Sequence, residues 1–146
     1  MGIFGWLPQR GPKPAAPDDA PEQTLAIYAS QPALTTIIVT LIGIEAEQID
    51  EIIDVTARRF GKKHRIVYLT DSLDFMRFRD RNAIFEYLPS ALEQKLHAAE
   101  ISWNAYLARR WRLLVSKWQP VHVIGYGQNI DVFLAAAPPM TARTDR

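Results

Sequence analysis

The sequence contains no cysteine, and this absence excludes several kinds of chemistry. Without thiols the 146-residue chain cannot form disulfides, thiolate metal sites or cysteine nucleophiles. It also has almost no excess charge, because 17 basic side chains balance 16 acidic ones and leave a formal net charge of +1. Binding of nucleic acid through bulk electrostatic attraction is therefore not expected.

Long apolar runs are missing too. No run approaches the roughly 20 residues that a membrane-spanning helix needs, and the N-terminus lacks the pattern of a secretory signal. We therefore expect a cytoplasmic protein, with peripheral contact to the inner membrane as an alternative that the sequence leaves open.

The signatures of cofactor, metal and hydrolase sites are also absent. The turn after the first predicted strand, LIGIEAE, has one glycine, and Glu45 and Glu47 would repel the phosphate of a dinucleotide there. His64, His97 and His122 have no neighbouring ligand at metal-binding spacing, and no G-x-S-x-G turn occurs. The sequence therefore predicts no cofactor and no metal ion.

The first 22 residues differ in composition from the rest of the chain. Repeated prolines between Pro8 and Pro21 predict an extended linker. Ahead of the linker, the stretch GIFGWL brings four large apolar side chains together, namely Ile3, Phe4, Trp6 and Leu7. Such a peptide suits docking to a partner protein or a membrane surface, and it can equally fold back onto its own domain. We accordingly divide the chain into residues 1–22 (docking peptide and linker), 23–137 (α/β domain) and 138–146 (tail).

Patterns of strands and helices alternate through residues 33–137. Four strands are predicted by the β-branched apolar run at 33–43 and by the stretches RIVYLTD, AIFEYLP and VHVIGYG. Helical spacing and a charge order that suits the helix dipole predict a helix within EAEQIDEIIDVTARRFG. Because no hairpin signal joins the strands, we predict a single Rossmann-like α/β domain with a short, mostly parallel sheet flanked by helices.

Shorter helical segments complete this pattern. SLDFMRFRDRN suits a short helix or turn, and IDVFLAAA suits a last element. Ser90 and Glu93 match a capping box, in which each side chain binds the other residue's backbone N–H. An apolar face is predicted to continue from there through Leu92 and Leu96 towards Trp118, with Ser102 as a second cap that would divide the run into two helices.

Ligands of parallel sheets bind beyond the carboxyl ends of the strands, and this rule selects the candidate ligand edge. Its residues are Glu45, Asp71, Ser72, Glu86 and Tyr126. For Asp71 the alternatives are a ribose hook, a catalytic acid, or a cap for the segment that follows. Alternation along the third strand predicts that Glu86 points away from the face that carries its two aromatic neighbours. No catalytic residue is assigned.

A second candidate surface lies on the long helix near the C-terminus. It consists of Arg109, Arg110, Trp111 and Arg112, because arginine beside indole can bind an anion or stack on a sugar. The alternative is a solvated helix whose tryptophans pack against the sheet while its arginines reach the solvent.

The succession TTIIVTLIGI, RIVYLTDSLDF, FEYLPS and KWQP before VHVIGYG resembles a known class of protein. Over Ala33 to Gly127 it is similar to the N-terminal Rossmann-like half of bacterial GT-B-type glycosyltransferase-like proteins of surface-polysaccharide synthesis. The resemblance implies an acceptor-side half domain. The motif of the donor-binding half has no counterpart in this chain.

The function implied by the resemblance is that of a glycosyltransferase-like accessory domain in polysaccharide or cell-envelope biosynthesis that is not catalytic alone. Its partners would be another protein subunit and a nucleotide sugar or glycan. The alternative is a noncatalytic interaction or assembly module that is recruited through GIFGWL.

Overall fold

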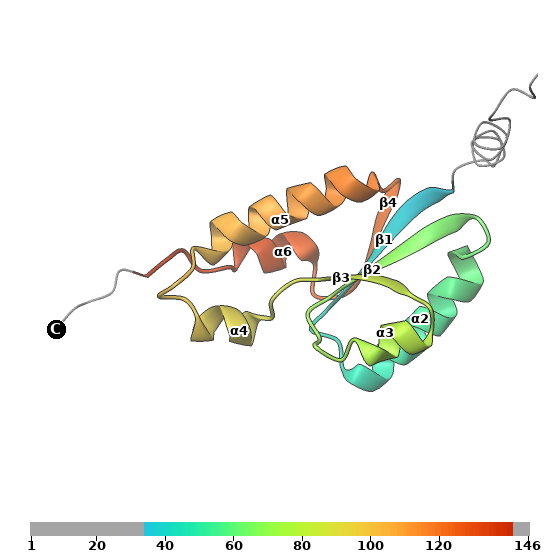
Figure 1. The fold of residues 1–146 in the computed structure, drawn as a ribbon, viewed down its shortest axis with the longest axis horizontal. Coiled ribbons are helices and arrows are strands. Elements are labelled where there is room, and N and C mark those ends of the chain that lie inside the picture. The colour runs from blue at the N-terminus through green and yellow to red at the C-terminus, as the bar shows by residue number, and fades with distance from the viewer. Residues whose placement is uncertain (1–33, 142–146) are drawn as a thin grey trace, which may run out of the picture. The chain divides into compact units, whose positions relative to one another are not determined.

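Four parallel strands form the centre of the part of the chain that the computed structural model describes, residues 34–141 (Figure 1). The elements follow one another as β1 (Thr35–Ile42), α2 (Ala46–Phe60), β2 (His64–Thr70), α3 (Met76–Asp80), β3 (Ile84–Tyr87), α4 (Ala91–Leu96), α5 (Trp103–Trp118), β4 (His122–Gly127) and α6 (Ile130–Ala135). The strand order is β3-β2-β1-β4. This arrangement confirms the predicted parallel α/β fold. The predicted docking peptide and linker, residues 1–22, lie outside the described residues.

Strand β1 is the central strand and pairs with β2 on one side and β4 on the other. Its sequence TTIIVTLI is buried from Thr36 to Ile42. Such burial is expected of a strand that has neighbours on both edges and helices on both faces, and it explains why the sequence is apolar without alternation. Alternate residues of β1 then supply two separate cores. Ile38 and Ile42 pack towards one face, and Val39 and Leu41 pack towards the other.

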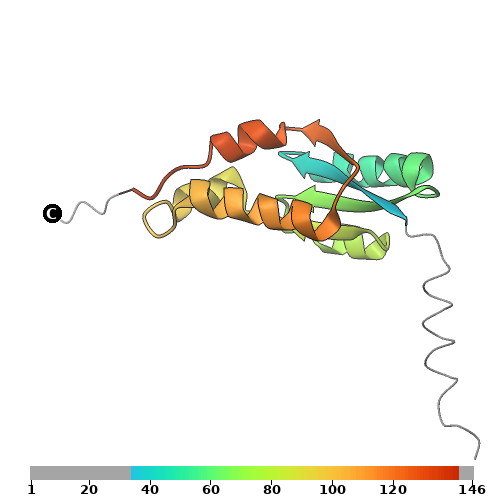
Figure 2. The same ribbon diagram turned by 90° about the horizontal axis from the view of Figure 1, so that it is seen from above.

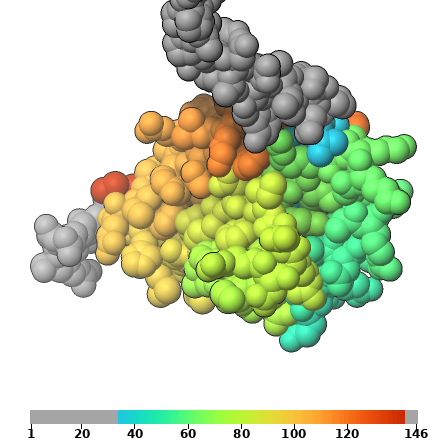
Figure 3. All heavy atoms as spheres, turned by 45° about the vertical axis from the view of Figure 1, so that its right-hand side comes forward, coloured from blue at the N-terminus to red at the C-terminus, as the bar shows by residue number. Residues whose placement is uncertain are grey.

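The helices form one layer on each face of the sheet. Figure 1 shows α2 and α3 on one side of the strands and α5 and α6 on the other. Figure 2, a view from above, shows β4 at an edge of the sheet with α6 beside it. In Figure 3 the segment of α3 and β3 (yellow-green) reaches the surface between the α2–β2 segment (green) and the α4–α5 segment (yellow to orange).

Helix α2 matches its sequence pattern closely. It runs from Ala46 to Phe60 with Glu47 in the first turn and Arg58 and Arg59 in the last, as the helix dipole favours. Its buried residues include Ile49 and Ile53, which contact the core on the side of Tyr68 and Phe78.

The helical region after β3 differs in part from the prediction. It is divided into α4 and α5 near Ser102, as the second cap position indicated. Ser90 accepts the Glu93 N–H at 3.2 Å, but the Glu93 carboxylate accepts the Tyr87 hydroxyl at 2.5 Å, so that only half of the predicted capping box forms. Leu92 and Leu96, predicted to belong to the apolar face, are largely exposed.

Two backbone hydrogen bonds involve residues of the predicted tail that the structure describes, 138–141. Asn104 N–H donates to the Pro138 carbonyl at 3.2 Å, and Thr141 N–H donates to the Ala98 carbonyl at 3.1 Å. These bonds attach the segment after α6 to the first turn of α5 and to the connection between α4 and α5. Among residues 34–141, no helix has the length and apolarity that crossing a membrane requires.

The aromatic cluster beneath α3 generates a prediction about stability. Phe78 is fully buried and stacks on Phe85 with ring centres 5.0 Å apart. Phe78→Ala should lower the free energy of unfolding by about 3–5 kcal/mol, because it removes a large buried ring and leaves a cavity. Urea denaturation measures the loss. Leu73→Ala, at a largely exposed position, is the control and should change it by less than about 0.5 kcal/mol.

Candidate functional site

Asp71 follows β2 at the carboxyl edge of the sheet, and its carboxylate binds the end of β1. Its two oxygens lie 3.2 and 3.3 Å from the Gly43 nitrogen and accept that N–H. Burial raises the pKa of Asp71 above its usual value, although the bond from Gly43 acts in the opposite direction. Asp71 is therefore not a cap for the segment that follows, because its hydrogen-bonding oxygens join two neighbouring strand ends.

The switch point between β1 and β4 is where a parallel sheet of this order would place a ligand. Here the chain itself fills the position. Gly127 has a positive φ of 74°, and a Cβ atom on it would lie 2.3 Å from the Ile42 carbonyl oxygen and 2.7 Å from Ile44 Cδ1. The Gln128 N–H also donates to the Ile42 carbonyl at 3.0 Å. The loops after β1 and β4 are thus in direct contact.

Ser72 follows Asp71 directly, whereas Glu45 follows the end of β1, and the two residues have different surroundings. The Ser72 N–H donates to Thr70 Oγ1 at 3.0 Å, and its hydroxyl accepts the Asp74 N–H at 3.2 Å, which stabilises the turn before α3. Glu45 is exposed directly before α2, and its side chain makes no capping bond there. Neither residue is held towards a shared site.

Glu86 projects from β3 towards α5, on the side opposite to Phe85 and Tyr87, as alternation predicts. Its Oε1 accepts hydrogen bonds from Lys117 at 2.6 Å and from the Trp118 indole at 2.8 Å, and Arg110 lies 3.4 Å from Oε2. Burial alone would raise the pKa of Glu86, but these hydrogen bonds and charges outweigh it, so that the pKa lies below its usual value. The carboxylate attaches α5 to the edge strand.

Tyr126 belongs to the opposite face of the sheet, where it packs against the core beneath α2 and α3. Glu86 and Tyr126 are therefore separated by the sheet, and only Asp71 and Ser72 are adjacent. The five candidates of the ligand edge do not converge on one cavity.

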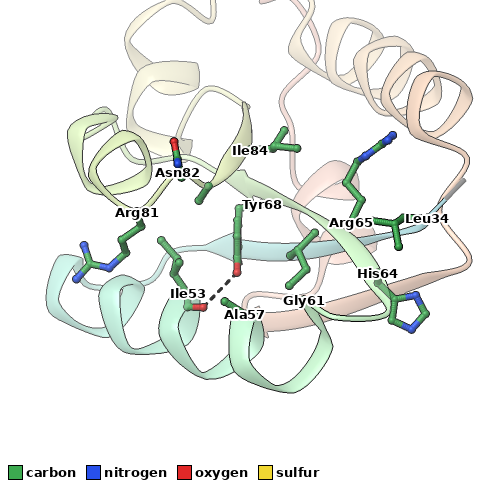
Figure 4. A pocket seen from close by; sticks show the side chains of 12 residues that line it. Leu34, Ile53, Ala57, Gly61, His64, Arg65, Tyr68, Arg81, Asn82 and Ile84 are labelled. Carbon is green, nitrogen blue, oxygen red and sulfur yellow. Dashed lines mark hydrogen bonds between the residues drawn. The ribbon is translucent and has the colours of Figure 1, made fainter. Parts of the chain in front are cut away.

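A pocket of about 290 Å³ lies near the amino-terminal ends of β2 and β3, between α2 and the loop after α3 (Figure 4). Two of its polar side chains, Tyr68 and Arg81, already have partners within the domain. The Tyr68 hydroxyl lies 2.7 Å from Thr56 Oγ1 and donates to the Ile53 carbonyl at 3.3 Å, and Arg81 pairs with Asp50 at 3.1 Å. Among residues 34–141, no three histidine, aspartate or glutamate side chains are grouped as a metal ion would need.

The predicted anion or sugar surface on α5 is divided between two environments. Trp111 packs against the core on the sheet side, and Arg110 pairs with Glu86. Arg109 and Arg112 are exposed, and within residues 34–141 neither has a carboxylate partner. The tryptophan thus follows the packing alternative, whereas the two exposed arginines remain available to an anion.

A surface stripe on the same helix joins two of these arginines to two apolar residues that were not predicted to lie there. Tyr106, Arg109, Arg110 and Leu113 line a shallow hollow of about 240 Å³. Tyr106 and Leu113 are 46% and 54% exposed. The i, i+3, i+4, i+7 spacing of these four residues could have identified the stripe, but Tyr106 was predicted to belong to the apolar face that continues towards Trp118.

Comparison of the chain with protein-family models, curated proteins and solved structures gave no match. The resemblance to glycosyltransferase-like proteins therefore stays a prediction, and functional inference depends on the geometry of this domain.

The contact between the loops after β1 and β4 can be tested with two glycines that share a positive φ. Gly127→Ala should lower the free energy of unfolding by about 2–5 kcal/mol, because left-handed backbone and overpacking both act against the new methyl group. Gly43→Ala is the matched control, since φ is 69° and no atom lies within 4 Å of its Cβ position. It should cost about 1–2 kcal/mol. Equal losses in urea denaturation would contradict the tight contact at Gly127.

The ionisation of Asp71 and Glu86 should affect stability with opposite signs. The raised pKa of Asp71 contributes stability below its unfolded value of about 3.9, and this contribution is lost as the pH rises through the folded pKa. The lowered pKa of Glu86 contributes stability above about 4.3, and this is lost as the pH falls through the folded pKa.

Relative to wild type, Asp71→Asn should therefore gain free energy of unfolding as the pH rises through the carboxyl range, whereas Glu86→Gln should lose it. Urea denaturation of both variants at a series of pH values measures the two slopes. If the free-energy difference from wild type changed with pH in the same direction for both variants, the pKa direction given for Asp71 or for Glu86 would be wrong.

Proposed function

We propose that this domain is a noncatalytic protein-interaction module, and that the outer stripe of α5 binds an acidic partner protein. The observation that carries the proposal is the composition of that stripe. Tyr106 and Leu113 flank Arg109 and Arg110 on the surface. Tyrosine and arginine are enriched among the residues that dominate protein interfaces, because one provides rigid contact area and the other provides several donors.

The charge of α5 supports the acidic character of the partner. Residues 103–118 contain four basic side chains, Arg109, Arg110, Arg112 and Lys117, and no acidic one. Glu86 pairs with Arg110 and Lys117 from below. Within the described residues, Arg109 and Arg112 have no carboxylate that offsets their charge. An acidic segment would supply it, and complementary charge would favour association over contact with basic proteins.

The carboxyl edge of the sheet supports a binding role rather than catalysis. Asp71 is engaged by Gly43, and Gly127 lies against Ile44, so that the groups which a nucleotide would meet contact one another. A parallel sheet does not by itself favour a glycosyltransferase-like accessory role, because such sheets support many unrelated functions. The predicted recruitment through Ile3, Phe4, Trp6 and Leu7 lies outside the described residues and stays a separate hypothesis.

Site-specific photo-crosslinking in cells tests the α5 stripe. A photoreactive phenylalanine at position 106 of the full chain should capture one predominant protein with an acidic surface segment, and Arg109→Glu should reduce that yield by about tenfold or more, as loss of a desolvated charge pair predicts. Arg79→Glu makes the same charge change on α3, across the sheet, and should leave the yield unchanged. Thermal melts should verify that both variants fold.

The same photoreactive group at the exposed position 92 on α4 provides the second control. If positions 92 and 106 capture the same proteins, or if Arg109→Glu has no effect, the α5 surface is not the contact. Capture of nucleic acid or lipid in place of protein would also overturn the proposal. Saturable calorimetric binding of a nucleotide sugar that Asp71→Ala abolishes at unchanged Tm would favour the glycosyltransferase-like alternative.

A further inference from the structure

Strand β4 leaves one side of its backbone without a strand partner among residues 34–141, because it pairs only with β1. The Val121 N–H donates to the Thr36 carbonyl at 2.8 Å, which fixes the hydrogen-bonding direction at the start of the strand. Since this direction alternates along a strand, His122, Ile124 and Tyr126 present their N–H and C=O groups away from β1. The outer side of β4 is therefore able to accept one more strand.

This edge lacks the features that usually prevent such pairing. Exposed strand edges are commonly protected by charged side chains, by a proline within the strand or by a bulge. Residues 119–130, QPVHVIGYGQNI, contain no charged side chain, and the single proline precedes the strand. Val121 and Val123 are 49% and 44% exposed. An apolar, uncharged strand edge favours a partner strand that is also apolar and uncharged.

The order of large and small side chains along β4 indicates that the partner strand is β4 of a second copy. Val121 directly precedes the strand and Val123 lies in its first half, whereas Gly125 and Gly127 lie in its second half. When two copies of β4 run antiparallel about a two-fold axis beside Ile124, each Val123 lies opposite the Gly125 of the other copy. Each His122 then lies opposite the Tyr126 of the other copy. Large residues meet small ones on one face, and an aromatic pair forms on the other.

We propose that β4 pairs with β4 of a second copy of this chain, and that two domains thereby form one continuous eight-stranded sheet. The pairing is isologous, so that every contact occurs twice. It places three outward-directed residues, His122, Ile124 and Tyr126, in hydrogen-bonded register with the same three residues of the second copy. The inference goes beyond the proposed function and uses a different surface from the α5 stripe. Either can fail without the other.

Sedimentation velocity of the full chain across a dilution series tests the pairing. The wild type should reach twice the mass of the 16.6 kDa chain as concentration rises. Val123→Lys should shift the dissociation constant upward by at least tenfold, because it introduces charge at the edge. His122→Pro should do the same, because it removes an outward N–H while the Val121 bond to β1 is retained. Ile84→Lys, at an exposed position of the opposite edge strand β3, is the matched control and should remain dimeric.

The absence of cysteine permits a direct readout of register. In the proposed pairing the Cα atoms of the two Ile124 residues are about 5.5 Å apart, within the range of a disulfide. Ile124→Cys should therefore form an interchain disulfide under mild oxidation, and Ile84→Cys should not.

Three outcomes would overturn the inference. A wild-type chain that stays monomeric at every concentration excludes the dimer. A dimer that persists in both Val123→Lys and His122→Pro places the interface elsewhere. Crosslinking that is equal at positions 84 and 124 excludes a specific β4 register. Far-UV circular dichroism and Tm of each variant distinguish a lost interface from a lost fold.

Discussion

The pairing of β1 with a strand on each side is the constraint on which the rest of the structure depends. Because both edges are occupied and both faces are covered, every residue from Thr36 to Ile42 is buried. The strand contributes side chains to the core under each helix layer. A change that displaces β1 would therefore disturb α2 and α5 together, although these helices lie on opposite faces.

The carboxyl edge shows how a sheet of this order can exist without an open ligand crevice. Asp71 binds Gly43, Gln128 binds Ile42, and Gly127 permits Ile44 to approach closely. Together these contacts occupy the groups that a ligand would use. The chemically distinctive surfaces that remain are external ones, namely the basic stripe of α5 and the uncharged edge of β4.

Local sequence signals were sufficient for the fold and insufficient for the site. The uninterrupted apolar run of β1 and the charge order of α2 are properties of short segments, and both elements appear where predicted. The partner of Asp71 lies 28 residues away in the chain, and this separation leaves no periodic signal. Leu92 was assigned to the apolar face, but it is largely exposed. Helical spacing shows which residues share a face of a helix, and it does not show whether another element covers that face. The bond between Glu93 and Tyr87 was missed for a different reason. The predicted cap uses the same carboxylate, and a sequence motif does not show which competing partner the carboxylate takes.

The position of β4 in the chain also has a consequence for the order of folding. A single helix connects β1 to β2, whereas β2, β3 and four helices separate β1 from β4. Closing the longer loop costs more chain entropy, so we expect β4 to join the sheet after β1 and β2 have paired. Until it does, β1, which is buried from Thr36 to Ile42 in the folded domain, presents a bare edge. Newly synthesised chains would then be most vulnerable to aggregation during this interval, and faster docking of β4 would protect them.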